Sequence, residues 1–368
     1  MDTAKAFDVV DHKGMLNSLY QQGVRGNMWS FFNNLYSDIA SAVKWNGELS
    51  TEFCELQGIR QGGTSSADCY KAGKNKVLHQ LEANPCMKIG TIPSGAIMVA
   101  DDLALMSNST HSMQQALIIA QQDASRERYT YNVEKTKVIS INRKEKTNLI
   151  LNNKSLGTSN SEMHLGSVRN STGTNRDTIR DRIQKARRVA YSLMGAGFYG
   201  LNGVGPEIAA IQYETYVIPT LLYGLEALIL DSNDIADLEK YHRACLRQIQ
   251  HLPKSTASAA VYLLIGIPPI EALLDIKILS TYRDIADVNH ASPPAVHIHE
   301  IITRQVALKE TTSYSWVIQL KKTIRKYQNL MNVYQILEKP PKKKAWKKGL
   351  KKEVILLTMG GWILLALV

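Results

Sequence analysis

The stretch that decides the fold of this chain is Ile97-Met98-Val99-Ala100-Asp101-Asp102-Leu103-Ala104-Leu105-Met106. Apolar residues flank two adjacent aspartates, a pattern that predicts a strand, a tight turn and a returning strand. Adjacent carboxylates repel each other and are costly to desolvate, and no cation lies within the run to relieve this cost. Hard oxygen ligands of this kind suit Mg²⁺. Taken alone, the run fits a divalent-metal site and a solvated hairpin tip equally well.

Four further blocks accompany this run in a fixed order along the chain. They are Met1-Asp-Thr-Ala-Lys-Ala-Phe-Asp-Val-Val-Asp11, Gly58-Ile-Arg-Gln-Gly-Gly-Thr-Ser-Ser66, Asn132-Val-Glu-Lys-Thr-Lys137 and Leu165-Gly166. In this order and at these spacings, the chain resembles the reverse transcriptases of non-LTR (LINE-type) retrotransposons. With the Asp-Asp run, the blocks correspond to motifs A to E of that family. Five ordered matches within about 170 residues are far more specific than any one of them.

The resemblance implies a two-metal polymerase site. In such a site two cations about 4 Å apart activate the primer hydroxyl and hold the triphosphate. The family's catalytic carboxylates correspond to Asp2, Asp101 and Asp102, which would bind two Mg²⁺ ions, with Mn²⁺ as a possible substitute. Asp11 precedes a helix-like run and is expected to cap it, so we leave it out of the metal site.

The resemblance also assigns roles around the nucleotide. Phe7 corresponds to the steric gate beneath the sugar, and Gln61 and Gly62 to the contact with the incoming nucleotide. Lys135 corresponds to a proton donor for the leaving pyrophosphate. From the residues alone, the alternatives are a core phenylalanine, an ordinary Gly-Gly loop before a helix, and a solvated lysine.

The composition fits a nucleic-acid partner, because the net charge is +11 and the pI about 9.3. The run from Arg176 places Ile179, Ile183 and Leu193 at helical spacing, whereas its basic residues fall largely outside that stripe. These basic residues are Arg180, Arg182, Lys185, Arg187 and Arg188. We expect Arg180, Arg187 and Arg188 to face the phosphates of a duplex, and a solvated basic helix is the alternative.

The predicted fold class is α+β. Residues 1–170 are expected to form the palm of a right-hand polymerase, an antiparallel sheet with helices that includes a hairpin around Asn46-Gly47. A helical thumb and connection (171–290), a helical C-terminal region (291–338) and a basic then apolar tail (339–368) follow. The family's fingers would precede Asp2 and are therefore expected to be missing.

The tail combines a dense lysine run, residues 339–352, with an apolar stretch, residues 354–368. The lysine run could bind RNA, direct nuclear import or be solvated. The apolar stretch is short for a membrane span, so no membrane partner is expected. The four cysteines lack metal-ligand spacing and are interpreted as reduced, buried thiols. With no signal peptide, an intracellular location, nuclear or cytoplasmic, is expected.

These inferences favour an RNA-directed DNA polymerase that acts on an RNA template, a DNA primer and deoxynucleoside triphosphates. The alternative is a nucleic-acid-binding remnant that has lost catalysis. Since most of the catalysis is positioning and charge stabilisation, we expect a chain without fingers to be inactive on its own.

Overall fold

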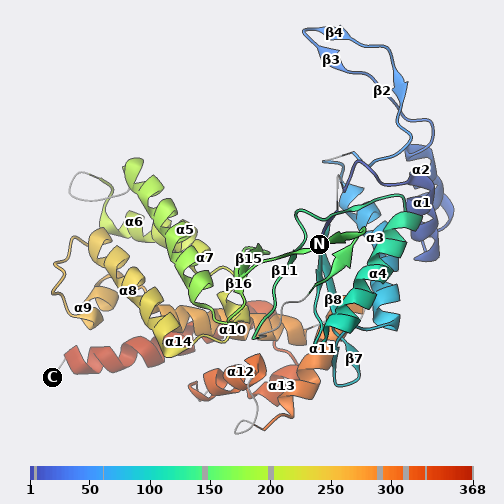
Figure 1. Cartoon of the computed structure of the whole chain (residues 1–368). Helices are drawn as coiled ribbons and strands as arrows, with labels where there is room; N and C mark the ends of the chain where they lie inside the picture. Colours follow the sequence, from blue (N-terminus) through green and yellow to red (C-terminus); the bar gives the residue numbers. More distant parts are fainter. Residues whose placement is uncertain are drawn as a thin grey trace. The chain divides into compact units, whose positions relative to one another are not determined.

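The computed structural model describes residues 1–3, 6–60, 62–142, 148–197, 203–287, 293–309, 315–327 and 330–366, without the side chains of residues 2, 293–295 and 361–366. The chain divides into two compact units, Met1–Asn160 and Ser161–Val368. Helices and strands are mixed in the first unit, and helices dominate the second (Figure 1).

The first unit alternates short strands with four helices. The helices are α1 (His12–Gln21), α2 (Gly26–Leu35), α3 (Ser66–Ala83) and α4 (Thr110–Arg126). The strands are β1 (Asp2–Thr3), β2 (Ala40–Ser41), β3 (Lys44–Trp45), β4 (Glu48–Leu49), β5 (Phe53–Cys54), β6 (Lys88–Ile89), β7 (Ile92–Pro93), β8 (Ala96–Val99), β9 (Asp102–Leu105), β10 (Tyr131–Asn132), β11 (Lys137–Val138), β12 (Ile150–Leu151), β13 (Lys154–Ser155) and β14 (Gly157–Thr158).

The strands of this unit form small ladders. Strands β8 and β9 pair antiparallel with Val99 opposite Asp102, as the sequence predicts for the Asp-Asp run. Strand β1 pairs antiparallel with β10. The backbones of Met1 and Leu103 exchange hydrogen bonds of 2.6 and 3.1 Å in both directions. These two bonds link the ladders, so β8, β9, β1 and β10 follow one another laterally.

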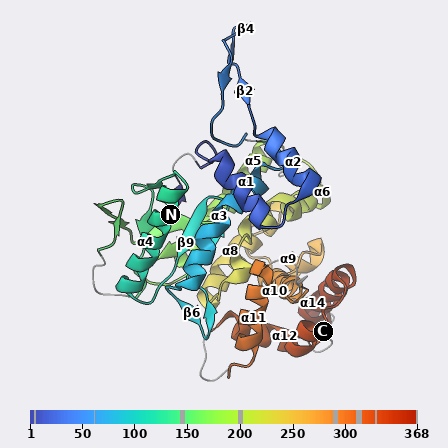
Figure 2. The ribbon, with the colours of Figure 1, turned by 90° about the vertical axis from the view of Figure 1, so that its right-hand side faces the viewer.

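Two apolar clusters hold the first unit together. One joins α3 and α4 to β9, with Val77, Leu103 and Leu117 at its centre. The other joins α1 to α3 through Met15, Leu19 and Cys69. The predicted hairpin around Asn46-Gly47 is present as β3–β4, and it extends away from the helices (Figures 1 and 2). Helices α3 and α4 therefore pack against the β8–β9 hairpin. The β3–β4 hairpin is exposed and contributes little to the core.

The second unit starts with a hairpin and continues as helices. The hairpin consists of β15 (Ser161–His164) and β16 (Ser167–Asn170). The helices are α5 (Arg176–Gly195), α6 (Pro206–Gln212), the π-helix η1 (Tyr213–Val217), α7 (Ile218–Leu221), the 3₁₀ helix η2 (Leu225–Ala227), α8 (Ser232–Ile249), α9 (Ser258–Ile265), α10 (Ile270–Ala286), α11 (Pro293–Val306), α12 (Trp316–Arg325), α13 (Val333–Glu338) and α14 (Lys343–Ala366). The first unit thus ends ten residues before the expected end of the palm at residue 170.

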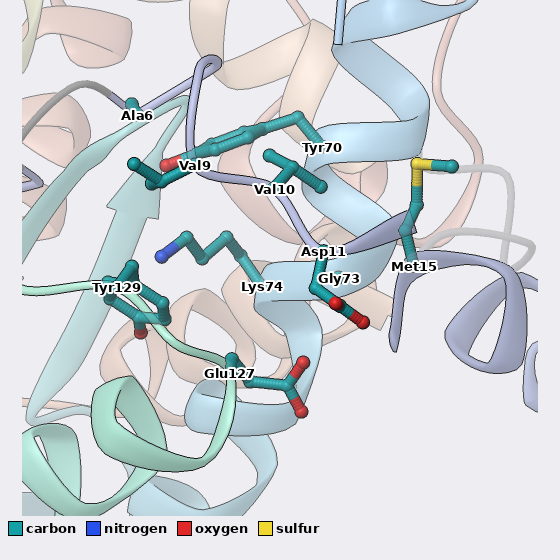
Figure 3. Close-up of a pocket in the computed structure, with 10 residues that line it drawn as sticks. All are labelled: Ala6, Val9, Val10, Asp11, Met15, Tyr70, Gly73, Lys74, Glu127 and Tyr129. Atoms are coloured by element: carbon teal, nitrogen blue, oxygen red, sulfur yellow. The ribbon is translucent and has the colours of Figure 1, made fainter. Parts of the chain in front are cut away.

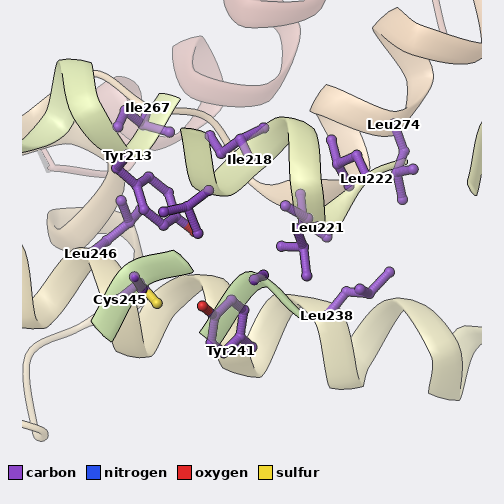
Figure 4. Close-up of a cluster of buried hydrophobic side chains, with 14 of the residues drawn as sticks. Tyr213, Ile218, Leu221, Leu222, Leu238, Tyr241, Cys245, Leu246, Ile267 and Leu274 are labelled. Carbon is purple, nitrogen blue, oxygen red and sulfur yellow. The ribbon is translucent and has the colours of Figure 1, made fainter. Parts of the chain in front are cut away.

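The larger core of the second unit packs α5 to α10 around Tyr213, Leu221 and Leu246 (Figure 4). The smaller core packs α10 to α14 around Tyr282, Leu320 and Leu350. The stretch expected to be a basic then apolar tail is instead the helix α14. Its Trp346, Leu350 and Val354 belong to the smaller core and its Met359 to the larger one. The sequence interpretation missed this helix because the lysines dominate the composition of the run.

Within the described residues, no single helix is long and apolar enough to cross a membrane. Helices α9 and α10 meet the criteria of length and composition only together, bent by 58°. All four cysteines are free thiols. Cys69, Cys86 and Cys245 are buried as expected, whereas Cys54 is exposed on β5, so the prediction that all four are buried is wrong.

Candidate active site

The turn between β8 and β9 presents the two aspartates. It consists of Ala100 and Asp101, and Asp102 opens β9. Ala100 has a φ of +56°, in the left-handed region where two-residue hairpin turns usually carry glycine or asparagine. Asp101 and Asp102 are half-buried, and neither carboxylate forms a hydrogen bond or ion pair within the described part of the chain. Two neighbouring carboxylates without a counter-charge at contact distance are a chemically suitable ligand set for a divalent cation.

The first block of the sequence lies next to this turn. Because Met1 and Leu103 bond to each other in both directions, the antiparallel register places the backbone of Asp2 opposite that of Asp102. On its other side, Asp2 pairs with Asn132. The side chain of Asp2 is not among those described. Among the side chains that are, no group of three or more His, Cys, Asp and Glu residues is arranged to hold a metal ion.

The second block adjoins the continuation of the first. The amide of Ile59 donates to the carbonyl of Phe7, and the amide of Gly58 to that of Val10, both at 2.8 Å. Gly58 has a φ of +99°, and a Cβ there would lie 3.1 Å from the carbonyl oxygen of Asp8, so the close approach of the two segments requires glycine.

Phe7 is half-buried and stacks on Tyr70 of α3, with ring centroids 4.9 Å apart. The contact holds the ring from one side, which suits both a steric gate and the core phenylalanine that the sequence left open. Gly62 has a φ of +86° with open space around it. Gln61 lies outside the described residues. The adjacency of these blocks supports the sequence interpretation, and the individual roles at the nucleotide remain predictions.

The block Asn132–Lys137, which corresponds to motif D, forms a capped turn that starts at the end of β10. The side-chain oxygen of Asn132 accepts hydrogen bonds from the amides of Glu134 and Lys135, at 3.0 and 3.2 Å. Lys135 is exposed. Since Asn132 pairs with Asp2, blocks A, B, C and D meet in one part of the first unit. Block E, Leu165-Gly166, turns the β15–β16 hairpin of the second unit.

Behind the first block lies a buried lysine that the sequence analysis did not single out. Lys74 of α3 is 8% exposed, and its ammonium nitrogen has no hydrogen-bond partner. The nitrogen lies 2.8 Å from the centroid of the Tyr129 ring. The side chain borders a cavity of about 30 Å³, which is also lined by Val9, Val10 and Tyr70 (Figure 3). That volume holds about one water molecule.

Burial lowers the pKa of Lys74 to about 7, although the carboxylates of Asp123, Glu127 and Asp101 act in the opposite direction. Lys74 therefore interacts electrostatically with Asp101 of the Asp-Asp turn. The spacing could have revealed the lysine in advance, because Tyr70, Lys74, Val77 and Leu81 form one helical stripe whose other members are all buried.

Helix α5 carries the predicted basic face. Ile179 is buried, whereas Ile183 and Leu193 are half-buried against the larger core. Arg180, Arg187 and Arg188 are exposed, as expected for residues that contact phosphates.

The placement of Arg182 on this basic face is wrong. Arg182 is 4% exposed, its guanidinium donates to the carbonyl of Gly166 and pairs with Asp181 at 3.0 Å, and it lies over the ring of Tyr223. Gly166 has a φ of +77°, and a Cβ there would lie 3.0 Å from the Tyr223 ring. Arg182 therefore fixes the block E turn on α5. Because this role depends on tertiary contacts, the helical periodicity of the sequence did not predict that Arg182 is buried.

Comparison with known families identifies this set of blocks. Residues 1–171 match the family model described as reverse transcriptase (RNA-dependent DNA polymerase). Residues 1–171 are a reverse transcriptase domain. The match begins with block A and ends with the β15–β16 hairpin that carries block E, so it contains all five blocks.

Proteins similar to this chain include Pol polyproteins of R2 retrotransposons. A Pol polyprotein from the type-1 element R2 of Popillia japonica is 22% identical over 286 residues, covering 71% of this chain and 37% of the relative. The Pol polyprotein of the type-2 element R2DM of Drosophila melanogaster is 25% identical over 114 residues, covering 31% of this chain and 11% of the relative. The chain thus spans less than half the length of these relatives.

Proposed function

We propose that the reverse transcriptase domain is an RNA-directed DNA polymerase whose metal-binding carboxylates are Asp2, Asp101 and Asp102. One observation carries the proposal: the exchange of hydrogen bonds between Met1 and Leu103 places the backbone of Asp2 opposite Asp102, although the two residues are 100 positions apart. A polymerase site needs carboxylates from separate segments at one point. In this interpretation residues 1–170 are a palm, and residues 171–290, which begin with α5, are a helical thumb and connection.

The residues around the turn fit Mg²⁺. Asp101 and Asp102 are half-buried carboxylates with no hydrogen bond or ion pair within the described residues, which favours an external cation with oxygen ligands. When bound, two Mg²⁺ ions would neutralise the triphosphate and lower the pKa of the primer hydroxyl. The stacking of Phe7 on Tyr70 would hold the ring against the sugar, and Gln61 and Gly62 would contact the nucleotide. Lys135 would give its proton to the leaving pyrophosphate.

The substrates follow from the reaction. The proposed partners are an RNA template, a DNA primer and deoxynucleoside triphosphates. Arg180, Arg187 and Arg188 on the exposed face of α5 would neutralise phosphates of the template–primer duplex.

One observation favours a second candidate, a nucleic-acid-binding remnant without catalysis. Lys74 places an ammonium without a hydrogen-bond partner in the otherwise apolar stripe of α3. A buried, unpaired charge destabilises the fold, and its positive charge competes with a cation at Asp101. Weaker binding of a cation at Asp101 would favour duplex binding without catalysis.

Primer extension on an RNA template with Mg²⁺ separates the two candidates. The full chain is compared with Asp101→Asn and with a matched control, Asp8→Asn, in which an exposed aspartate of block A loses the same charge. Extension by the wild type and the control, lost in Asp101→Asn, supports the polymerase. Duplex binding without extension in all three fits both the remnant and the expected inactivity of a chain without fingers, so the assay is then repeated with the chain fused to the fingers of a related reverse transcriptase. Extension by that fusion supports the polymerase, and no extension supports the remnant. Equal extension by Asp101→Asn and the wild type would contradict the assigned carboxylates.

A further inference from the structure

Helix α14 carries a stripe of lysines on one face of its first half. Lysines at these positions follow the spacing i, i+3, i+4, i+7 and i+8, which places them on the same side of a helix. This lysine stripe consists of Lys344, Lys347, Lys348, Lys351 and Lys352, all of them exposed. None of the five forms an ion pair within the described part of the chain. The neighbouring Lys343 differs, because it pairs with Asp284 at 2.7 Å.

The opposite face of the same half is fixed in the core. Trp346, Leu350 and Val354 recur every four residues, and they are 7%, 0% and 0% exposed. All three belong to the smaller core of the second unit, together with residues of α10 and α12. The lysines are therefore held in place by a folded element and differ from the lysines of a solvated tail.

The arrangement is unfavourable for the isolated protein. Like charges three and four residues apart on a helix repel one another, and the stripe begins in the first turn, where the helix dipole is positive. The first turn contains no acidic residue. A polyanion along the helix would relieve both costs.

We propose that the lysine stripe is a second nucleic-acid contact, which binds the phosphate backbone of a duplex without reading its sequence. The inference rests on the proposed function for the nature of the partner. The stripe spans about 12 Å along the helix, a length over which a duplex presents about seven phosphates. Lysine is a compact point charge without the fork of donors with which arginine reads guanine, so sequence-independent contacts are expected.

A membrane surface is the competing partner for a basic amphipathic helix. Such a helix inserts its apolar face among the lipids, but here the apolar face behind the stripe is buried in the protein. Because the apolar face is not available for insertion, a partner that binds through its negative charges alone, such as a nucleic-acid duplex, is favoured over a membrane.

The test uses the full chain and a fluorescent duplex whose binding is titrated with salt. In the stripe variant, glutamine replaces the five lysines of the stripe. In the matched control, glutamine replaces five exposed lysines elsewhere, namely Lys13, Lys44, Lys88, Lys154 and Lys254. We expect the slope of log affinity against log salt to fall by about four in the stripe variant and by much less in the control. Equal changes in both variants would show that only net charge matters and would overturn the inference.

Two further measurements keep the result interpretable. Arginine at all five stripe positions retains the charge and should retain the salt slope, which separates loss of charge from loss of folding. Vesicles of anionic phosphatidylserine replace the duplex in a parallel titration. If the stripe variant loses vesicle binding but keeps the wild-type duplex slope, the stripe contacts membranes and the proposal is wrong. Primer extension and its dependence on Asp101 report separately on the proposed polymerase.

Discussion

The turn that presents the aspartates contains a residue in an unfavourable conformation. Ala100 has a φ of +56°, and left-handed backbone costs a non-glycine residue about 1 kcal/mol or more. We therefore expect Ala100→Gly to raise the free energy of unfolding by about 1 kcal/mol, as measured by denaturant titration. The matched control is Ala104→Gly in the middle of β9, which should lower it because glycine weakens a strand interior. Stabilisation by both substitutions or by neither would contradict this account of the turn.

The buried Lys74 predicts an unusual dependence of stability on pH. Its pKa is lowered to about 7 in the folded chain and is about 10.4 in an unfolded one. Between these values the unfolded state binds more protons, so the free energy of unfolding should rise with pH by at most about 1.4 kcal/mol per unit. The charged, buried Lys74 destabilises the fold by its full amount below about pH 7, and this destabilisation decreases as the pH rises toward 10.

Lys74→Met removes the charge while keeping a side chain of similar length. We expect this variant to be more stable than the wild type by a few kcal/mol at pH 7, with the advantage shrinking toward pH 10. Thermal or denaturant unfolding at several pH values measures the difference, and Lys71→Met, at an exposed position of the same helix, serves as the control. A stability difference that does not vary with pH would show that the pKa of Lys74 is the same in the folded and unfolded chains, which would contradict its lowering by burial.

Some residue-level features followed from local chemistry and others did not. Asp11 caps α1 by accepting from the amide of Gly14 at 2.7 Å, as predicted, since capping depends on a few neighbouring residues. The pairing of Met1 with Leu103 joins distant segments, and only the family resemblance indicated it. Lys74 was overlooked because a lysine is normally solvated, although its position among apolar residues at helical spacing indicates that it is buried.

Among the helices, α5 combines an exposed basic face with a single buried arginine, and the two should respond differently to mutation. Replacing Arg180, Arg187 and Arg188 with alanine should leave folding intact and reduce the salt slope of duplex binding by about three. Anisotropy titrations measure the slope. A slope identical to that of the wild type would mean that this face serves solubility alone.

The substitution Arg182→Met tests the structural role of the buried arginine of α5. It removes the hydrogen bond to the carbonyl of Gly166 and the ion pair with Asp181. Because a buried acceptor is left unsatisfied, we expect a loss of about 1–3 kcal/mol in the free energy of unfolding. Arg180→Met at the exposed face provides the control, and equal stabilities of the two variants would contradict the structural role of Arg182.

Elements with a strong local pattern were predicted well. The Asn46-Gly47 hairpin is confirmed because its turn residues take the positive φ angles, +46° and +88°, that such a turn requires. Helix α14 was missed, although Trp346, Leu350 and Val354 recur at helical spacing. Its Gly-Gly pair argues against a helix when propensity is considered alone, and the core packing of α14 overrides that preference.

At the scale of the whole molecule, the first unit exposes much apolar surface. Met28, Phe31 and Leu35 of α2 are 59%, 57% and 45% exposed, and Trp45 and Leu49 of the β3–β4 hairpin are 76% and 70% exposed. Exposed apolar residues in such number favour association. We expect light scattering to show concentration-dependent oligomers that diminish when Met28, Phe31 and Trp45 are replaced by glutamine. A wild-type chain that stays monomeric at all concentrations would contradict this expectation.

The mixed helix and strand composition and the reverse transcriptase domain were predictable, because the five blocks occur in order along the chain. The division into units after Asn160 was predicted less closely. The β15–β16 hairpin directly follows the strands of the first unit along the chain, but Arg182 fixes it to α5 of the second unit. This contact joins residues far apart in the sequence, so the sequence alone did not reveal it.

The position of α14 has a genetic consequence. This last helix supplies Trp346, Leu350 and Val354 to one core of the second unit and Met359 to the other. Truncation of the chain shortly before Lys343 would therefore spare the proposed metal ligands and still deprive both cores of a helix. Alleles truncated at that point should encode an unstable product, so the reading frame is constrained far downstream of the proposed catalytic residues.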